Sequence, residues 1–233
     1  MVDVKGKWAL VTGANRGVGY RIAKFMAGKG CNLILHSRSL EHTQKVLSEV
    51  REMGVEAYDV AAELSDLCQV EKMIEEIKAH GKPVDILFND AAVQIAYRTD
   101  YYKTPAEDYS KSFMINTIAP MMLCYAFIPP MIERGWGRVI NTTSGIRNEP
   151  EQAGYSASKA ALDKVTNDLA GKLDGTDVCI NLTDPGWCRT DLGGPNAPND
   201  PDSVIPGICV GAFIDDKISG RNLGAQGFAG MTL

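Results

Sequence analysis

The chain has 233 residues and a mass of 25.2 kDa, which is enough to enclose a sizeable core in one domain. Its 24 basic residues against 29 acidic ones give a net charge of −5, which argues against nucleic acid and anionic membranes as partners. Six scattered cysteines favour reduced thiols in a cytoplasmic protein, and three histidines without ligand spacing argue against a metal site.

Short apolar runs alternate with amphipathic segments along most of the chain. The pattern predicts strands at 8–13, 31–37, 55–60, 83–90, 137–144, 177–184 and near 221–226. Helical periodicity predicts helices at 18–28, 40–53, 65–81, 105–134 and 153–173, and a short helix near the end of the chain. Strands joined by helical crossovers predict a parallel, doubly wound α/β sheet with helices on both faces, in one domain spanning 1–233.

Two stretches depart from this alternation. The most apolar one, 114–132, is interrupted by an asparagine and three prolines, so a buried helix is predicted there rather than a membrane span. The start of the chain lacks the apolar core of a signal peptide. After Pro185, a segment rich in proline and glycine predicts a flexible substrate lid near 187–206.

The first predicted strand ends in the glycine-rich stretch TGANRGVG, residues 12–19, and a helix follows. Gly13, Gly17 and Gly19 allow the backbone to approach a pyrophosphate, and the helix N-terminus offers free N–H groups and a partial positive charge. The alternative is a tight strand–helix turn that needs small residues only for packing.

The second predicted strand ends in HSRS, where dinucleotide-binding proteins that prefer NAD carry an acidic residue. Here Ser37 and Arg38 occupy that place, so no carboxylate repels a 2′-phosphate and a guanidinium is available to bind it. Arg16 is expected on the same rim. These residues predict NADP(H) in preference to NAD(H), and the alternative is that both arginines are merely solvated.

Tyr155 and Lys159 lie four residues apart at the start of a predicted helix, so their side chains share one helix face. An ammonium about 4 Å from a phenol, at an effective dielectric near 20, supplies on the order of 4 kcal/mol. That energy would lower the pKa of a tyrosine by about three units, which makes the phenol useful for proton transfer near neutral pH. The alternative is a surface pair on an amphipathic helix.

Together these motifs resemble those of the short-chain dehydrogenase/reductase family. The matching residues are TGxxxGxG at 12–19, NDAA at 89–92, Asn116, Ser144, Tyr155 with Lys159, and Pro185–Gly186. The resemblance implies a sheet of about seven strands and a catalytic tetrad of Asn116, Ser144, Tyr155 and Lys159. It also implies, with the glycine turn and the arginines, a cofactor site made of Gly13, Asn15, Arg16, Gly17, Val18, Gly19, Ser37, Arg38, Glu63, Leu64, Asn89, Ala91, Tyr155, Lys159, Pro185, Gly186 and Thr190.

The chain departs from the family pattern at several positions. Asp90 replaces the usual second asparagine of the NNAG-like motif, Ala92 replaces a glycine, and Glu63 stands where aspartate is commoner. The segment from Ser144 to Tyr155 is shorter than in many relatives. Thr142 and Thr143 therefore remain alternatives to Ser144 as the group that polarises the carbonyl.

The function that these residues predict is reduction of a small-molecule carbonyl, or oxidation of a secondary alcohol, with Tyr155 as general acid/base. Lys159 is expected to hold the cofactor ribose and Asn116 to position a relay water, by family resemblance. Alternatives are a non-catalytic NADP(H)-binding sensor, a dedicated 3-oxoacyl thioester reductase, an epimerase or dehydratase, and a hydrolase, although no GxSxG motif occurs. A homodimer or homotetramer is expected through the helices at 105–134 and 153–173.

Three segments are expected to line the substrate pocket: Gln94, Ile95 and Tyr97; residues 146–152; and Trp187 with Cys188. The first and third are mainly apolar, which suits a ketone with a hydrophobic body. The charged middle segment weakly disfavours an acidic carrier protein as partner. Cys188 is expected to be an inert thiol because no histidine accompanies it.

Overall fold

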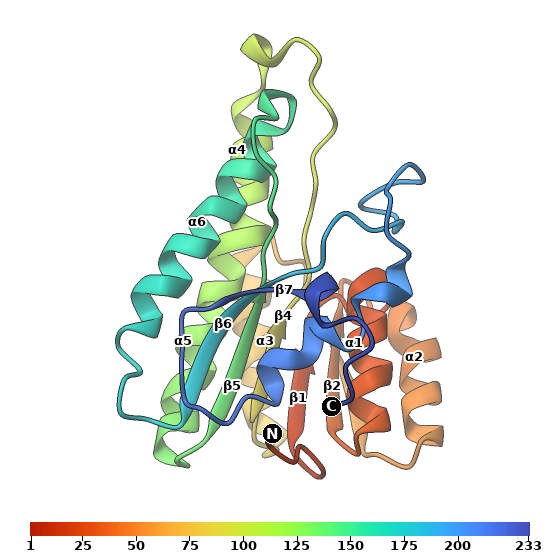
Figure 1. Cartoon of the computed structure of the whole chain (residues 1–233), viewed down its shortest axis with the longest axis vertical. Coiled ribbons are helices and arrows are strands. Elements are labelled where there is room, and N and C mark those ends of the chain that lie inside the picture. Colours follow the sequence, from red (N-terminus) through yellow and green to blue (C-terminus); the bar gives the residue numbers. More distant parts are fainter.

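A computed structural model describes all residues, 1–233, and has an α/β fold with helices on both faces of one sheet (Figure 1). The strands are β1 (Trp8–Val11), β2 (Asn32–Ser37), β3 (Ala57–Ala61), β4 (Ile86–Asn89), β5 (Gly137–Thr142), β6 (Val178–Asp184) and β7 (Asn222–Gly224). The α-helices are α1 (Gly17–Gly28), α2 (Leu40–Glu52), α3 (Leu67–Ala79), α4 (Ala106–Phe113), α5 (Ala119–Glu133) and α6 (Ala153–Ala170).

All seven strands pair in parallel, in the order β3-β2-β1-β4-β5-β6-β7. The order reverses between β1 and β4, and this reversal is where an open α/β sheet forms a crevice at the carboxyl ends of its strands. The predicted fold is therefore confirmed, including the number of strands.

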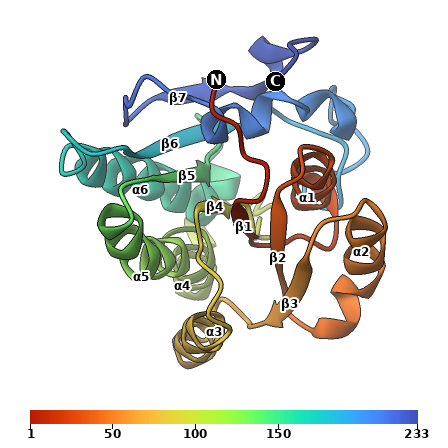
Figure 2. The same cartoon turned by 90° about the horizontal axis from the view of Figure 1, so that it is seen from below.

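Two apolar cores lie on opposite faces of the sheet, as the view from below shows (Figure 2). One core contains the inner faces of α1 and α2 together with the turn at Gly207–Ala212. The other contains the inner faces of α3 and α5, and the end of α6. Strands buried on both faces read as continuous apolar runs, which is why their positions were predictable, although the predicted bounds differ by up to three residues at an end.

The predicted helix at 105–134 is divided in three. A π-helical turn at Met114–Ile118 joins α4 to α5, and Pro120, which has no N–H group to donate, lies just after this turn. The combined helix Ala106–Glu133 is long and apolar enough by composition to cross a membrane, but 61% of its most apolar window is buried in the fold. It therefore serves as a core helix here.

The segment after β6 contains no α-helix. The short helix that the sequence predicts before the last strand is present, as a 3-10 helix at Gly207–Ala212, and further 3-10 turns form at Pro201–Val204 and Ala225–Phe228. Gly207 explains part of this, since a Cβ atom there would lie 2.0 Å from the Ala225 carbonyl oxygen. The turn is packed directly onto the backbone that follows β7.

Arg138 of β5 is buried, with 1% of its surface exposed. Its guanidinium donates hydrogen bonds to the carbonyl oxygens of Ile214, Gly137 and Asp177, and to the Asp177 carboxylate at 2.9 Å. The planar group also lies 4.7 Å from the centroid of the Trp136 ring. One side chain thus joins the sheet to the loop before β6 and to the C-terminal segment.

Candidate active site

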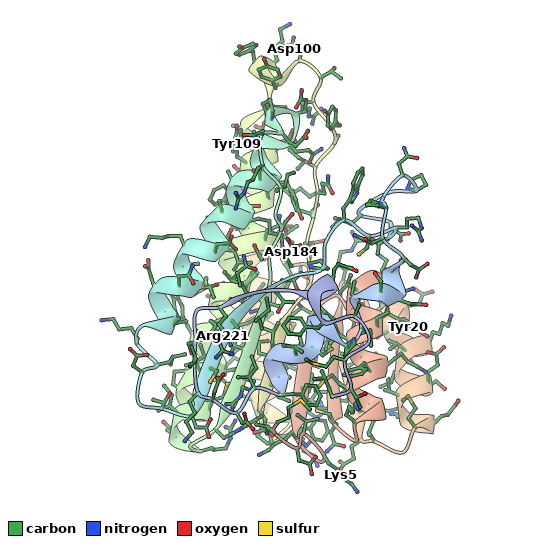
Figure 3. The ribbon with its side chains drawn as sticks, in the orientation of Figure 1. Lys5, Tyr20, Asp100, Tyr109, Asp184 and Arg221 are labelled. Atoms are coloured by element: carbon green, nitrogen blue, oxygen red, sulfur yellow. The ribbon has the colours of Figure 1, made fainter.

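A cleft of about 1010 Å³ opens along the carboxyl edge of the sheet, where Asp184 at the end of β6 is labelled in Figure 3. Its volume is at the upper end of the range for ligand pockets, about 300–1,000 Å³. Most of the predicted site residues line it: Gly13, Asn15, Arg16, Gly17, Val18, Ser37, Arg38, Glu63, Leu64, Ala91, Ser144, Tyr155, Lys159, Pro185, Gly186 and Thr190. Residues from six separate parts of the chain therefore meet in one crevice.

The glycine turn lies at the base of this cleft. Gly13 has a φ of +69°, and a Cβ atom there would lie 3.1 Å from the Ala91 Cα atom. Gly19 is buried and does not line the cleft; a Cβ atom there would lie 2.4 Å from the Gly13 carbonyl oxygen. Gly19 therefore permits close packing of α1 on the turn, and its predicted contact with the cofactor is at most indirect.

His36, at the end of β2, supports the glycine turn from behind. Its Nδ1 accepts a hydrogen bond from the Gly13 N–H (3.3 Å), so its Nε2 carries the proton and donates to the Ala62 carbonyl oxygen (3.0 Å). Burial lowers the pKa of His36 to about 4. Sequence reasoning missed this residue, because a lone histidine at the end of an apolar strand has no motif around it.

We expect His36 to make the fold sensitive to acid. Its folded-state pKa of about 4 lies below the ordinary value of 6.5, so only the unfolded chain binds a proton between these values. Stability is therefore present above pH 6.5 and is lost as the pH falls toward 4, by up to about 3 kcal/mol. Urea unfolding of the wild type and His36→Asn between pH 7.5 and 4 measures the difference. Equal pH dependence in both proteins would contradict it.

The two arginines that were predicted to bind a 2′-phosphate differ in their surroundings. Arg16 forms an exposed ion pair with Asp191 at 2.7 Å, across the cleft mouth. Arg38 is exposed, lines the cleft and has no ion-pair partner. The Ser37 hydroxyl donates to the Ser39 carbonyl oxygen at 2.6 Å. Of these groups, Arg38 is the one whose charge is available to an incoming anion.

Tyr155 lies in the first turn of α6 and is buried, although it lines the cleft. Burial raises the pKa of Tyr155, and a hydrogen bond with the Ser144 side chain opposes that rise. The carboxylates of Asp184 and Asp90 raise the pKa further. Ser144 and Tyr155 are thus brought together as predicted.

The expectation that Lys159 makes this tyrosine acidic is wrong for this structure. The Lys159 ammonium lies 6.0 Å from the centroid of the Tyr155 ring and donates instead to the Thr142 carbonyl oxygen, at 2.7 Å. Burial lowers the pKa of Lys159 to about 8, against the opposing effect of three carboxylates. The lysine is therefore a buried and readily titrated cation, while the phenol is a weaker acid than free tyrosine.

The threonines that were alternatives to Ser144 face other partners. The Thr142 hydroxyl donates to Asp90 at 2.9 Å, and the Thr143 hydroxyl donates to Asp163. Both side chains are buried. The Ser144 hydroxyl accepts from the Ile146 N–H at 3.3 Å, and of the three hydroxyls it is the one that lowers the pKa of Tyr155.

Two predicted site residues besides Gly19 lie outside the cleft lining. The Asn116 side chain accepts from the Val93 N–H and donates to the Val93 carbonyl oxygen and to Ser158. Both N–H groups of its amide are thus used to hold the loop after β4 against α6, and no side-chain donor is left for a water. Asn89 is buried and donates to Asn141 at 2.8 Å, so it ties β4 to β5 beneath the cleft.

The outer part of the cleft contains the predicted substrate residues. Tyr97 and Trp187 line it and are 59% and 57% exposed, and the Trp187 indole N–H is held by the Gly193 carbonyl oxygen at 2.7 Å. Gln152 is buried and donates to the Ile95 carbonyl oxygen. The pKa of the Cys188 thiol is raised by burial, which agrees with an inert cysteine.

The loop after β6 is held by its own hydrogen bonds. Arg189 donates to the carbonyl oxygens of Ala197 and Pro198 and pairs with Asp200 at 3.1 Å. Asn199 donates through its side chain to the Trp187 carbonyl oxygen. The predicted flexibility of 187–206 stays a prediction, but the loop is more cross-linked than its composition suggested.

The cleft fits a dinucleotide in shape and in chemistry. Gly17, at a φ of +58°, opens α1 beside Thr190, and the free end of this helix faces the cleft, as a pyrophosphate site requires. Arg38 lies at the end of β2, on the side where an adenosine ribose would lie. No group of three or more His, Cys, Asp or Glu side chains could hold a metal ion.

Comparison with known proteins finds a family model, curated relatives and solved structures that are similar to this chain. A model of the short chain dehydrogenase family matches residues 7–200. A short chain dehydrogenase of Pseudocercospora fijiensis (strain CIRAD86) is 32% identical over 199 residues, which are 83% of this chain and 63% of that protein. The chain thus matches less than two thirds of that relative's length.

Solved structures are similar over nearly the whole chain. A 3-oxoacyl (acyl-carrier-protein) reductase from Agrobacterium tumefaciens, solved with NADP bound, has a TM-score of 0.85 at 25% identity, over 95% of this chain and 93% of that one. A metagenomic short-chain oxidoreductase in complex with NADP has a TM-score of 0.82 at 29% identity, over 95% and 97%.

Proposed function

The chain belongs to the short-chain dehydrogenase/reductase family, and we propose that it is an NADP(H)-dependent enzyme that interconverts a carbonyl and a secondary alcohol. The observation that carries this proposal is the meeting of Ser144, Tyr155 and Lys159 in the cleft that also contains the glycine turn. The NADP in the two similar structures supports the choice of cofactor. When bound, NADPH supplies the hydride.

The chain's own residues would provide proton transfer and charge stabilisation. Tyr155 donates a proton to the carbonyl oxygen of the substrate, and the Ser144 hydroxyl donates a hydrogen bond to the same oxygen as negative charge develops. Lys159 provides a buried positive charge one helical turn away. Since burial raises the pKa of Tyr155, the phenol is protonated at neutral pH and ready to act as the acid in the direction of reduction.

Loss of absorbance at 340 nm with NADPH and a panel of carbonyl compounds tests this function. The panel should contain aliphatic and aromatic ketones, keto sugars, steroids and 3-oxoacyl thioesters. Turnover of a free ketone supports the general reductase. Binding of NADPH without turnover of any carbonyl would favour the sensor alternative instead.

A dedicated 3-oxoacyl thioester reductase is the second candidate function, supported by the similarity to the Agrobacterium tumefaciens enzyme. The loop that lines the outer cleft exposes Glu149 beside Arg147, so it offers no net positive charge to an acidic carrier protein. We therefore favour free small molecules as substrates. A kcat/KM for a 3-oxoacyl carrier-protein thioester far above that for every free ketone would reverse this preference.

We expect Arg38→Asp to reverse the preference between cofactors. The change removes the unpaired guanidinium at the end of β2 and places a carboxylate against the 2′-phosphate, and like charges in contact cost several kcal/mol. The ratio of kcat/KM for NADPH over NADH should fall by about 100-fold or more. Fluorescence titration with both reduced cofactors checks whether binding changes in parallel.

Arg16→Asp is the matched control for this substitution. Its guanidinium already pairs with Asp191, so we expect its effect on the ratio to be several-fold smaller. An unchanged ratio in Arg38→Asp, or an equal fall in both variants, would show that Arg38 does not select the cofactor.

We also propose that the protein self-associates through α4 and α5. Tyr109 on α4, Ile118 at the end of the π-helical turn, and Tyr125 and Ile132 on α5 are between 38% and 63% exposed. Ile118, Tyr125 and Ile132 follow one another at seven-residue spacing, which places them on one helix face, and exposed apolar groups of this kind are typical of a subunit interface. The second predicted surface, on α6, presents no large exposed apolar side chain, so α4 and α5 are the stronger candidates.

A further inference from the structure

A partly buried carboxylate and a buried ammonium meet through one threonine at the base of the cleft. Lys159 donates to the Thr142 carbonyl oxygen at 2.7 Å, and the Thr142 hydroxyl donates to Asp90 at 2.9 Å. The other Asp90 oxygen lies 3.1 Å from the position that a Cβ atom on Gly19 would take, so the carboxylate also rests on the first turn of α1. Both charged groups line the same cleft.

We propose that Asp90 is a positioning residue that keeps Lys159 protonated and fixed on Thr142. The negative charge of Asp90 stabilises the ammonium, while the Thr142 hydroxyl fixes the carboxylate and the Thr142 carbonyl fixes the lysine. An asparagine at position 90 would preserve the shape of this arrangement but not its charge. The inference rests on the proposed role of Lys159 in the reaction and adds the residue that sets its protonation.

The other charged groups near this pair do not replace Asp90. Asp163, on α6, accepts from Thr143 and is half-buried, and Asp184 lies at the end of β6, where it accepts from the Gly186 N–H at 2.8 Å. Tyr155 faces the pair from α6, and the buried thiol of Cys209 lies behind Asp90. Both of these are neutral at pH 7, because burial raises the pKa of each. Asp90 is thus the carboxylate that shares a hydrogen-bonded residue, Thr142, with Lys159.

The electrostatics agree with this geometry. Burial lowers the pKa of Lys159 to about 8, and among the carboxylates that oppose this, Asp90 has the largest effect, ahead of Asp163 and Asp184. Burial in turn raises the pKa of Asp90 to about 6, against the effects of Thr142 and Lys159. At a pH between about 6 and about 8, the Asp90 carboxylate is therefore ionised and Lys159 is protonated.

NMR titration of the cofactor-free protein, with lysine labelled at Cε, tests the proposal without any turnover. The Lys159 signal is identified by its loss in Lys159→Arg. We expect Asp90→Asn to lower the titration midpoint of Lys159 by roughly one pH unit, because an opposite charge at this range shifts a pKa by about one to three units. A midpoint that moves by less than about 0.3 units would overturn the proposal.

Two control variants separate charge from structure. Asp163→Asn removes a carboxylate that is more exposed and not bonded to Thr142, so we expect less than half of the Asp90→Asn shift. An equal shift would mean that the nearby carboxylates together, and not Asp90 in particular, set the titration midpoint of Lys159. Thr142→Val keeps both charges, and it should move the midpoint less than Asp90→Asn does. Asp90→Ser replaces Asp90→Asn if that variant does not fold, with the same expected shift.

Kinetics give a second readout for the active enzyme. Because Lys159 loses its proton at lower pH in Asp90→Asn, the alkaline limb of the kcat/KM profile should move to lower pH. The shift should be about as many pH units as that of the NMR midpoint. An alkaline limb that stays in place while the midpoint moves would contradict the role in the reaction. If no carbonyl is turned over, the proposed function fails, whereas the titration still decides whether Asp90 controls Lys159.

Discussion

Tyr155→Phe is expected to lower kcat by about 10²- to 10⁴-fold, the usual contribution of a positioned general acid. The substitution removes only the hydroxyl, from a ring that is buried in the first turn of α6, so the wall of the cleft keeps its shape. Affinity for NADPH should change by less than about threefold, because Arg38 and the glycine turn are untouched. Steady-state kinetics and fluorescence titration measure the two quantities.

The matched control is Tyr97→Phe, in which the same atom is removed from a tyrosine of the same cleft that is 59% exposed and lies in the outer loop. We expect its kcat to stay within about threefold of the wild type, and any change to appear in KM. If Tyr155→Phe retains full activity, Tyr155 is not the acid, and the proposed reaction mechanism is wrong.

Arg138→Met is expected to lower the free energy of unfolding by about 3 kcal/mol or more, since removing one partner of a buried ion pair typically costs 3–5 kcal/mol. Methionine fills most of the volume but removes the hydrogen bonds of the guanidinium to the carbonyl oxygens of Ile214, Gly137 and Asp177, of which that of Asp177 still accepts from the Gly137 N–H. Urea unfolding followed by far-UV circular dichroism at pH 7.5 gives the difference.

Arg134→Met is the control for this stability prediction. Arg134 also donates to a carbonyl oxygen and pairs with an aspartate, but its side chain is 37% exposed and its ion pair is longer, at 3.4 Å. We expect a loss of less than about 1 kcal/mol there. If the free energy of unfolding falls by a similar amount in the two variants, the burial of Arg138 and its hydrogen bonds to the C-terminal segment do not determine the loss of stability.

The fold was predictable because the apolar runs and the helical periodicity of the sequence agree with the strands and helices of one parallel sheet. The apolar runs of β1, β2, β4 and β5 are short, buried on both faces and separated by helical periodicity, which permits little except a parallel sheet. The region after β6 was not predictable in the same way. Its turns are fixed by contacts such as Gly207 against Ala225, between residues with no periodic relation.

The site was predictable where residues lie close in sequence and less so where they meet through the fold. The spacing of Tyr155 and Lys159 on one helix face needed only helical geometry, whereas their hydrogen-bond partners did not follow from it. Lys159 binds the Thr142 carbonyl oxygen, and Arg16 pairs with Asp191 on the opposite side of the cleft. Both contacts join segments that are distant in the sequence. The same holds for His36, whose role is to join the glycine turn to the segment after β3.

The hydrogen bonds within the loop after β6 have a consequence for how ligands enter. Arg189, Asn199 and Trp187 fix the loop's internal shape before anything binds, so any opening must be a swing of the whole segment about its two ends. Little backbone freedom is then left to lose when a substrate arrives, and pre-organisation of this kind strengthens binding. Arg189→Ala removes hydrogen bonds within the loop after β6. It would make the loop at the cleft entrance less ordered and raise KM more than it lowers kcat.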